Sequence, residues 1–382
     1  MKRKNLSVLY KALTSSTPLI PSHLWGSDSG KARGFLFHPA DWTITLTELH
    51  AGGSDLILIR MARAPPDPVF TLRGSAASVN TLHFHCAEPG LPLLYSGSGK
   101  GLVHVWNLNT RRAESVLDGH AGASVIWVST VRSTNTFLSH GRDMKVCVWD
   151  LHEGRRTVVQ SLYTGSVGFC QCFLLEADGS KTLLALPGEN MAEIKVRELG
   201  NQTLTCSLIP DDNHGMLMCM KMWQSDTGPL LCAGYEDGSL LIWDVSYRRL
   251  LSSLKVHPEP VMCLDFDVCK QKGISGSSDK SLCSWTLDGQ QNLQIQDSVP
   301  LTNPGVSHLS IRGDGKIVAT AGWDGNVRIF SWKKMKPLAI LQHHKDLVYS
   351  VVFSDHPEPS KRLMAAGSKD QLISLWSIYT QS

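Results

Sequence analysis

The 382-residue chain has no long apolar run, and no stretch approaches the roughly 18–20 apolar residues of a membrane-spanning helix. It also has almost no excess charge, since 37 Lys and Arg residues are balanced by 34 Asp and Glu residues. A protein that binds nucleic acid or a membrane surface usually carries a basic field, so we expect neither partner. The basic start at Met1-Lys2-Arg3-Lys4 is followed by a short apolar stretch broken at Lys11, which makes a poor secretory signal.

Cysteine is present ten times, but no two cysteines have C-x-x-C spacing and no Cys/His group has zinc-finger spacing. Several lie in strand-like runs such as Lys145-Val146-Cys147-Val148-Trp149. We interpret them as reduced core thiols of an intracellular protein, with a functional thiol pair at Cys170 and Cys172 as the less favoured alternative. The sequence therefore predicts no metal site, and nothing in it indicates a cofactor.

Motifs of enzymes are missing as well. Ser98-Gly99-Lys100-Gly101 resembles a phosphate-binding loop, but Leu94 stands where that loop needs its first glycine, and Gly101 where it needs Ser or Thr. There is no G-x-S-x-G elbow and no H-E-x-x-H pair. We expect no catalytic residues and interpret the chain as something other than an enzyme.

A repeated pattern occupies residues 68–382. Each repeat ends in a strand-like run closed by Trp-Asp or a related pair, and the closing positions are spaced by 43, 48, 46, 42, 45 and 46 residues. A period near 40–45 residues with a Trp-Asp signature is typical of four-stranded propeller blades. The seven closing positions are Trp106, Trp149, Arg197, Trp243, Trp285, Phe330 and Trp376.

A second signal has its own phase within the repeat. Runs of the form V-x-x-(V/L)-x-(F/I), such as Val79…Leu82…Phe84 and Val348…Val351…Phe353, predict inner strands that pack on both sides. Tight turns rich in Gly, Ser and Asp separate the two signals. The chain is predicted to be all-β, a seven-bladed propeller with a divergent third blade, where Arg197 replaces Trp.

Residues 1–64 do not share the repeat. They contain prolines and several glycines, with only a weak alternation between Trp42 and Leu49, and we predict a mostly flexible N-terminal extension. The propeller is assigned to residues 65–382. The last repeat leaves no room for a fourth strand before Ser382, so we expect strand 69–72 to complete the seventh blade and close the ring.

Polar residues recur at fixed places in the repeats. An Asp lies six residues before the closing aromatic in five repeats, a hydroxyl ten residues before it in several, and a His near the start of several. Because a buried indole N–H and imidazole need partners, these sets predict structural hydrogen-bond networks, and their recurrence argues against a catalytic Ser-His-Asp triad. The two complete sets are His120, Ser139, Asp143, Trp149, and His257, Ser275, Asp279, Trp285.

A binding surface is predicted where the turns project. The residue before each turn Asp should lie on one face of the ring, positioned by a rigid scaffold. Trp and Arg are enriched in binding hot spots, which favours Trp323, although local packing is an equal alternative, and solvated turn charges are the simpler interpretation of Arg142 and Lys369. The five candidate contact residues are Arg142, Glu236, Ser278, Trp323 and Lys369.

The Trp-Asp signatures and the Trp–Ser–His–Asp sets resemble those of the WD-repeat propeller family. Longer runs, among them Ala319-Thr320-Ala321-Gly322-Trp323-Asp324 and Ala366-Gly367-Ser368-Lys369-Asp370-Gln371, resemble a group within it that is related to fungal ASTRA-associated proteins. The resemblance covers roughly residues 65–382. It implies a cytoplasmic and nuclear scaffold that binds the TTT co-chaperone complex, helps phosphatidylinositol-3-kinase-related kinases to mature and supports DNA-damage signalling.

Two other functions stay open at this level. One is a G-protein β-like subunit, although residues 1–64 lack the sustained heptads of a helix that would coil with a γ chain. The other is a substrate receptor of a ubiquitin ligase. In each case we expect protein partners and a monomeric propeller.

Overall fold

The computed structural model describes residues 42–51, 54–63, 65–86, 91–132, 134, 136–150, 156–166, 168–176 and 181–379. The chain divides into two compact units, Met1–Ala64 and Pro65–Ser382. In the first, β1 (Trp42–Ala51) and β2 (Ser54–Arg63) form a two-stranded antiparallel hairpin. Residues 1–41 lie outside the described part, so the predicted flexibility of the extension stays a prediction.

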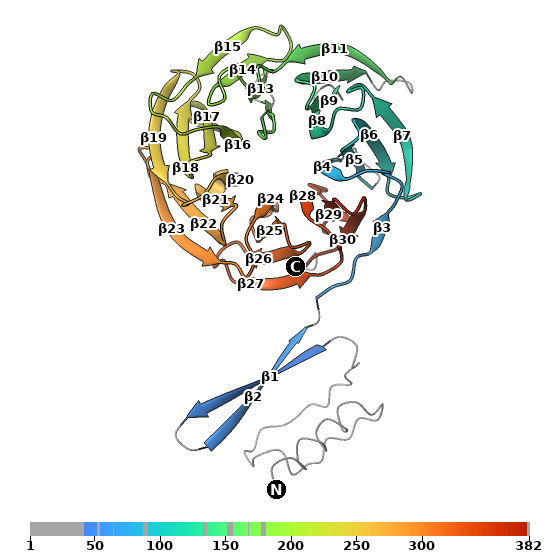
Figure 1. Ribbon diagram of the computed structural model, residues 1–382, viewed down its shortest axis with the longest axis vertical. Coiled ribbons are helices and arrows are strands. Elements are labelled where there is room, and N and C mark those ends of the chain that lie inside the picture. The colour runs from blue at the N-terminus through green and yellow to red at the C-terminus, as the bar shows by residue number, and fades with distance from the viewer. Residues whose placement is uncertain are drawn as a thin grey trace. The chain divides into compact units, whose positions relative to one another are not determined.

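The second unit is a ring of seven four-stranded antiparallel sheets, the seven-bladed propeller that the repeats predict (Figure 1). We call the strands of a blade a to d, from the innermost to the outermost. Blades 1 to 4 comprise β4 (Val79–His85), β5 (Leu93–Ser98), β6 (Leu102–Asn107), β7 (Arg112–Asp118); β8 (Val125–Val131), β9 (Thr136–Gly141), β10 (Lys145–Asp150), β11 (Thr157–Tyr163); β12 (Phe173–Glu176), β13 (Thr182–Pro187), β14 (Ile194–Glu198), β15 (Leu204–Leu208); and β16 (Leu217–Ser225), β17 (Gly228–Tyr235), β18 (Ser239–Asp244), β19 (Arg249–Lys255).

The remaining three blades follow the same order. They comprise β20 (Val261–Asp267), β21 (Lys272–Ser277), β22 (Ser281–Leu287), β23 (Leu293–Pro300); β24 (Val306–Ile311), β25 (Ile317–Gly322), β26 (Val327–Ser331), β27 (Pro337–Leu341); and β28 (Val348–Phe353), β29 (Met364–Ser368), β30 (Ile373–Trp376), β3 (Phe70–Leu72). Two short 3-10 helices, Val268–Lys270 and Pro359–Lys361, lie between a and b strands. No helix in the described ranges has the length and apolar character needed to span a membrane.

The core of the ring lies between blades. Seven clusters of buried apolar side chains each join two neighbouring sheets, for example Val105 and Trp149 between blades 1 and 2. The first valines of the inner strands, among them Val79 and Val348, are fully buried. Because both faces of these sheets pack on a neighbour, the inner strands read as apolar on both sides, which is the pattern that the sequence shows.

The seventh sheet contains both ends of the repeat region. β3 pairs antiparallel with β30, with Phe70 opposite Leu375 and Leu72 opposite Ile373, and Val69 N donates a hydrogen bond to Leu375 O. Leu72 is 1% exposed and packs in the cluster between blades 7 and 1. Figure 1 shows β3, in blue, beside β30, in dark red, so the strand before blade 1 is the outermost strand of blade 7.

The third blade has four strands like the others but different side-chain chemistry. Arg197 occupies the closing position on β14, half-buried and paired with Leu184 of β13. Glu193, just before β14, accepts hydrogen bonds from Glu189 N at 2.8 Å and Ser207 Oγ at 2.5 Å. A carboxylate thus fixes a turn that an Asp-His pair fixes in other blades.

Candidate functional site

Blade 2 contains one complete predicted network. Trp149 Nε1 donates to Ser139 Oγ at 2.9 Å, and Ser139 Oγ lies 2.8 Å from His120 Nε2. His120 Nδ1 lies 3.0 Å from Asp143 Oδ1, and that same oxygen accepts from Lys145 N. With Trp donating, the serine hydroxyl donates to the imidazole, whose other nitrogen donates to the carboxylate. The four residues link strands b and c to the loop before the blade.

Blade 5 forms only part of the second predicted network. His257 contacts Ser275 Oγ at 2.9 Å and Asp279 Oδ2 at 3.3 Å. The predicted bond from Trp285 to Ser275 does not form, since Trp285 Nε1 is buried without a partner. The Trp285 indole instead covers Gly273, whose missing side chain leaves the space, and stacks on Phe266 with ring centroids 5.5 Å apart. Aromatic packing has therefore taken the place of the indole hydrogen bond.

Blade 7 builds the same network from a different position. His344 Nδ1 lies 3.0 Å from Asp370 Oδ2, and His344 Nε2 lies 2.8 Å from Ser374 Oγ, which also accepts from Trp376 Nε1. Ser374 belongs to strand c, two residues before the Trp, whereas the pattern places the hydroxyl ten residues before it on strand b. The side chains of adjacent antiparallel strands meet, so either strand can supply the hydroxyl.

Two further turn Asp residues have partners that the pattern did not identify. His214 Nδ1 lies 2.9 Å from Asp237 Oδ2, with a sequence separation close to that of the other His–Asp pairs. In blade 6, Arg328 Nη1 donates to Asp324 Oδ1 at 3.1 Å, and Asn303 Nδ2 donates to Asp324 Oδ2 at 2.8 Å. Burial alone would raise the pKa of Asp324, but these hydrogen bonds hold it well below its usual range. The Asp therefore fixes the b–c turn in each case.

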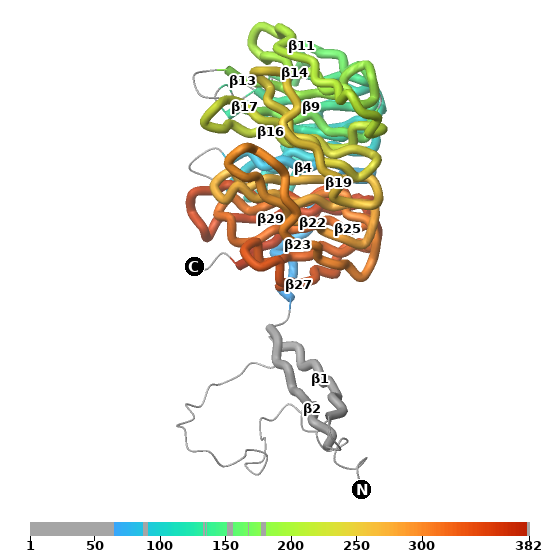
Figure 2. The backbone as a smooth tube through the Cα atoms, turned by 90° about the vertical axis from the view of Figure 1, so that its left-hand side faces the viewer, coloured from blue at the N-terminus to red at the C-terminus, as the bar shows by residue number. Residues whose placement is uncertain are grey.

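The b–c turns and the loops that lead from one blade to the next lie on one face of the ring, which we call the b–c face. Figure 2 shows the ring from the side, with the strands running between its two faces. A cavity of about 980 Å³ runs through the centre and is lined by residues of all seven inner strands. Of the five predicted contact residues, the structure places Arg142 and Trp323 at this cavity.

Arg142 and Trp323 are both partly fixed. The guanidinium carbon of Arg142 lies 5.1 Å from the centroid of the Phe169 ring, and Phe169 is 55% exposed. Trp323 packs over Gly305, whose φ of +88° and missing side chain admit the indole, yet Trp323 stays 38% exposed. Local packing therefore holds Trp323 in place and leaves part of its ring open to solvent.

The other three predicted contact residues are not among those that line the cavity. Glu236 Oε2 accepts from Met216 N at 3.0 Å. Ser278 N donates to Pro260 O, and Lys369 Nζ lies 3.6 Å from Asp346 Oδ2 in an exposed pair. Each of these contacts joins a b–c turn to the loop that enters the same blade.

Sequence reasoning missed a ring of seven side chains at the cavity. Each directly follows a buried residue at or just before the start of an inner strand, and in five blades that residue is the first valine of the inner-strand run, so the pattern contained the signal there. Two methionines, Met218 and Met262, occupy this position in the neighbouring blades 4 and 5, and methionine adapts readily to different partner surfaces. The seven residues are Asn80, Ile126, Gln171, Met218, Met262, Ser307 and Tyr349.

Polar groups deeper in the cavity tie neighbouring inner strands together. Lys221 Nζ lies 2.7 Å from Asp265 Oδ1, and Asp265 Oδ2 accepts from Ile311 N at 2.7 Å. His308 Nδ1 lies 3.0 Å from Val351 O. Burial lowers the pKa of His308, with Asp265 opposing the shift, so the imidazole is neutral at pH 7 and serves as a hydrogen-bonding bridge.

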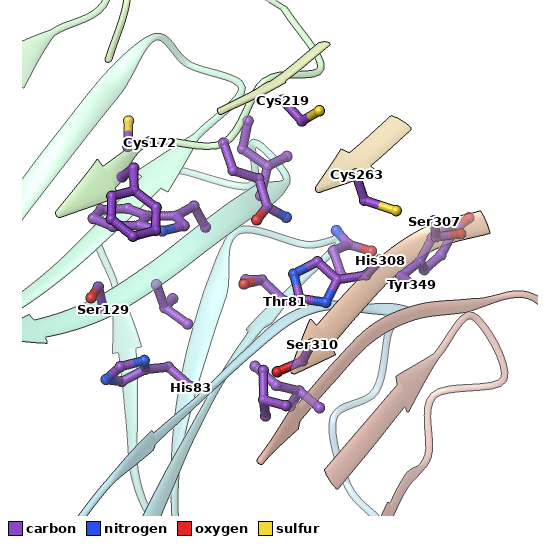
Figure 3. A pocket seen from close by; sticks show the side chains of 18 of the residues that line it. Thr81, His83, Ser129, Cys172, Cys219, Cys263, Ser307, His308, Ser310 and Tyr349 are labelled. Carbon is purple, nitrogen blue, oxygen red and sulfur yellow. The ribbon is translucent and has the colours of Figure 1, made fainter. Parts of the chain in front are cut away.

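The cavity wall also carries Cys172, Cys219 and Cys263, seen with Thr81 and His308 in Figure 3. All ten cysteines are free, and burial raises the pKa of the Cys172 and Cys219 thiols. Cys172 and Cys219 are therefore protonated thiols at neutral pH and poor nucleophiles. Among the described residues, no three His, Cys, Asp or Glu side chains gather in a group able to hold a metal ion.

The comparisons with known proteins agree with this architecture. The description "WD domain, G-beta repeat" matches residues 204–244, 248–286, 298–331 and 335–377. The chain is 49% identical over 321 residues to the mouse guanine nucleotide-binding protein subunit beta-like protein 1, covering 82% of this chain and 97% of that protein. The chain belongs to this family of WD-repeat propellers.

More distant relatives have a second name. The chain is 26% identical to the ASTRA-associated protein 1 of Aspergillus flavus, over 82% of this chain and 98% of that protein. It is 24% identical to the protein of the same name in Schizosaccharomyces pombe, over 82% of this chain and 99% of that protein. The relatives thus match almost over their whole lengths, and the predicted resemblance to this group is confirmed.

Proposed function

We propose that the chain is a non-catalytic adaptor that binds other proteins through the b–c face. The observation that carries this proposal is the exposed rim of Arg142, Phe169 and Trp323 at the mouth of the central cavity. Exposed aromatic and Arg side chains on a rigid frame are the residue types that dominate binding energy at protein interfaces. The methionine pair, Met218 and Met262, adds apolar surface that adjusts to the partner.

The proposed partners are the subunits of the TTT co-chaperone complex and, through them, the phosphatidylinositol-3-kinase-related kinases. The relatives named ASTRA-associated protein 1 support an adaptor within a larger assembly. Support of kinase maturation would make DNA-damage signalling depend on this protein, in the cytoplasm and the nucleus. Along the described cavity wall, burial raises the pKa of the Cys172 and Cys219 thiols and lowers that of His308, and Lys221 pairs with Asp265, so none of these groups is an activated nucleophile.

The test captures the tagged full-length protein from cell lysate and identifies the bound proteins by mass spectrometry. Wild type is compared with an Arg142→Ala, Trp323→Ala variant. The control is Arg112→Ala, Arg249→Ala, two exposed residues that begin d strands on the opposite face. We expect co-chaperone subunits and large kinases with wild type and control, and their loss with the rim variant.

Each other result has a definite meaning. A G-protein γ chain or a ubiquitin-ligase core as the main partner would overturn the adaptor proposal in favour of one of the alternatives. If the same co-chaperone subunits bind wild type and the rim variant equally, the partner is correct and the b–c face is wrong. Thermal unfolding of each variant is the control for an intact ring, and both variants should melt like wild type.

A further inference from the structure

The face opposite the rim carries an unusual set of cations where blades 5 and 6 meet. We call this the c–d face, because the loops from a to b and from c to d lie on it. The loop between β26 and β27 contains Lys333, Lys334 and Lys336, and the a–b turns of the two blades add Lys270, Lys272 and Lys316. Among the described residues, only Lys270 of these six forms an ion pair with a carboxylate, Asp267 at 3.2 Å.

Three of these lysines surround one small hollow. The hollow has a volume of about 270 Å³, enough for a single side chain. Its wall offers hydroxyl and amide donors, and Gln296 Nε2 already donates to Thr286 Oγ1 at 3.0 Å. The lining residues are Lys272, Lys333, Lys334, Ser284, Thr286, Gln296, Asp297 and Met335.

Lys272 is fixed before any ligand arrives. Its ammonium donates to Trp332 O at 3.2 Å and lies 4.4 Å from the centroid of the Trp332 ring. Trp332 is itself fully buried, with Nε1 donating to Asp267 Oδ2 at 2.8 Å. A cation held over an aromatic ring loses little further freedom when an anion binds, so the site is preorganised.

The charge in the hollow is not balanced. Three ammonium groups face one carboxylate, Asp297, and no ion pair joins Asp297 to any of them within the described part of the chain. Burial lowers the pKa of Lys272, and the nearby charge of Lys270 lowers it further. The carboxylates of Asp297 and Asp267 raise this pKa and so oppose the shift. The contact with Trp332 holds Lys272 in place, and the excess of ammonium groups over carboxylates makes the hollow complementary to an anion.

We propose that this hollow binds a phosphorylated Ser or Thr in an acidic segment of a protein partner. A phosphate carries about −1.5 to −2 charges and three acceptor oxygens, so it matches the excess of two positive charges that the three lysines leave over Asp297 and accepts from several donors at once. A single carboxylate has one charge and two acceptor oxygens, so it would use fewer of these lysines and donors. A nucleic acid is less suitable, because Trp332 is buried and offers no open ring for base stacking. This goes beyond the proposed adaptor function, since it uses the opposite face.

The test is fluorescence anisotropy at physiological salt with a short labelled peptide in which glutamates flank one phosphoserine. Wild type should bind this peptide about tenfold or more tightly than its unphosphorylated counterpart. A Lys333→Glu, Lys334→Glu variant should lose this binding. The control Arg112→Glu, Arg249→Glu has the same change in net charge on the same face and should bind like wild type.

A Lys272→Gln variant should weaken binding too, because it removes the fixed cation. The proposal is overturned if wild type does not discriminate the phosphopeptide, or if both charge-reversal variants lose binding equally. It is also overturned if a single-stranded RNA oligonucleotide binds more tightly through Lys333 and Lys334. The Arg142→Ala, Trp323→Ala variant should bind the phosphopeptide normally, so failure here is distinct from failure of the adaptor proposal.

Discussion

At the scale of residues, the same four side-chain types give different results in different blades. Trp149 donates to Ser139, whereas Trp285 stacks on Phe266 and leaves its indole N–H without a partner. The difference arises at the residue opposite the tryptophan. In blade 5 this residue is Gly273 of β21, and its missing side chain leaves room for the Trp285 indole to pack on the strand. Blades 2 and 5 therefore form a natural pair for measuring what the indole hydrogen bond contributes.

A double-mutant cycle in each blade tests this. For Ser139→Ala, Trp149→Phe and the combined variant, we expect a coupling of about 1 kcal/mol in the free energy of unfolding, the usual net value of a buried hydrogen bond. For Ser275→Ala and Trp285→Phe we expect a coupling near zero, since no bond joins these side chains. Chemical unfolding measures both cycles. Equal coupling in the two blades would contradict the different geometries.

At the scale of elements, the ring depends on a three-residue strand. β3 completes the seventh sheet, and its Leu72 fills the core between the last and first blades. Without β3, the outer edge of β30 would expose unpaired backbone groups. The closure links the two ends of the repeat region, so β3 affects blades that are far apart in sequence.

Truncation in this strand gives the second prediction. Leu72→Ala should lower the free energy of unfolding by about 2–5 kcal/mol, because it empties a fully buried site. Val69→Ala, three residues earlier and 52% exposed, should change it by less than about 0.5 kcal/mol. Urea unfolding monitored by tryptophan fluorescence compares the two variants. A small effect of Leu72→Ala would mean that the ring does not need this strand.

At the scale of the whole molecule, buried neutral histidines make stability depend on pH. Burial lowers the pKa of His140 to about 4, with His120 adding to the shift and Asp143 opposing it. An unfolded histidine has a pKa near 6.5, so between these values the unfolded state binds the extra proton. The stabilisation is fully present above about pH 6.5 and is lost as pH falls toward 4, by up to about 1.4 kcal/mol per pH unit.

The corresponding experiment measures the free energy of unfolding of wild type and His140→Gln at pH 7, 6 and 5. The wild-type protein should lose stability toward pH 5, and the variant should lose less because its side chain does not titrate. Identical pH dependence of the two proteins would show that His140 does not contribute. The variant keeps the other titratable groups of the wild type, so the difference between the two pH dependences reports His140.

The sequence alone determined the architecture, because the repeat period, the closing aromatics and the inner-strand runs each report local packing that every blade shares. It also determined the complete network of blade 2, whose members follow the standard spacing. Only the tertiary structure decided that Ser374 supplies the hydroxyl in blade 7 and that Trp285 stacks. It also brought Phe169 beside Arg142 and Lys272 onto Trp332. These contacts join side chains on neighbouring strands and turns. A shift of one residue or a missing side chain decides which partner lies within reach, and the repeat pattern contains no information about such differences between blades.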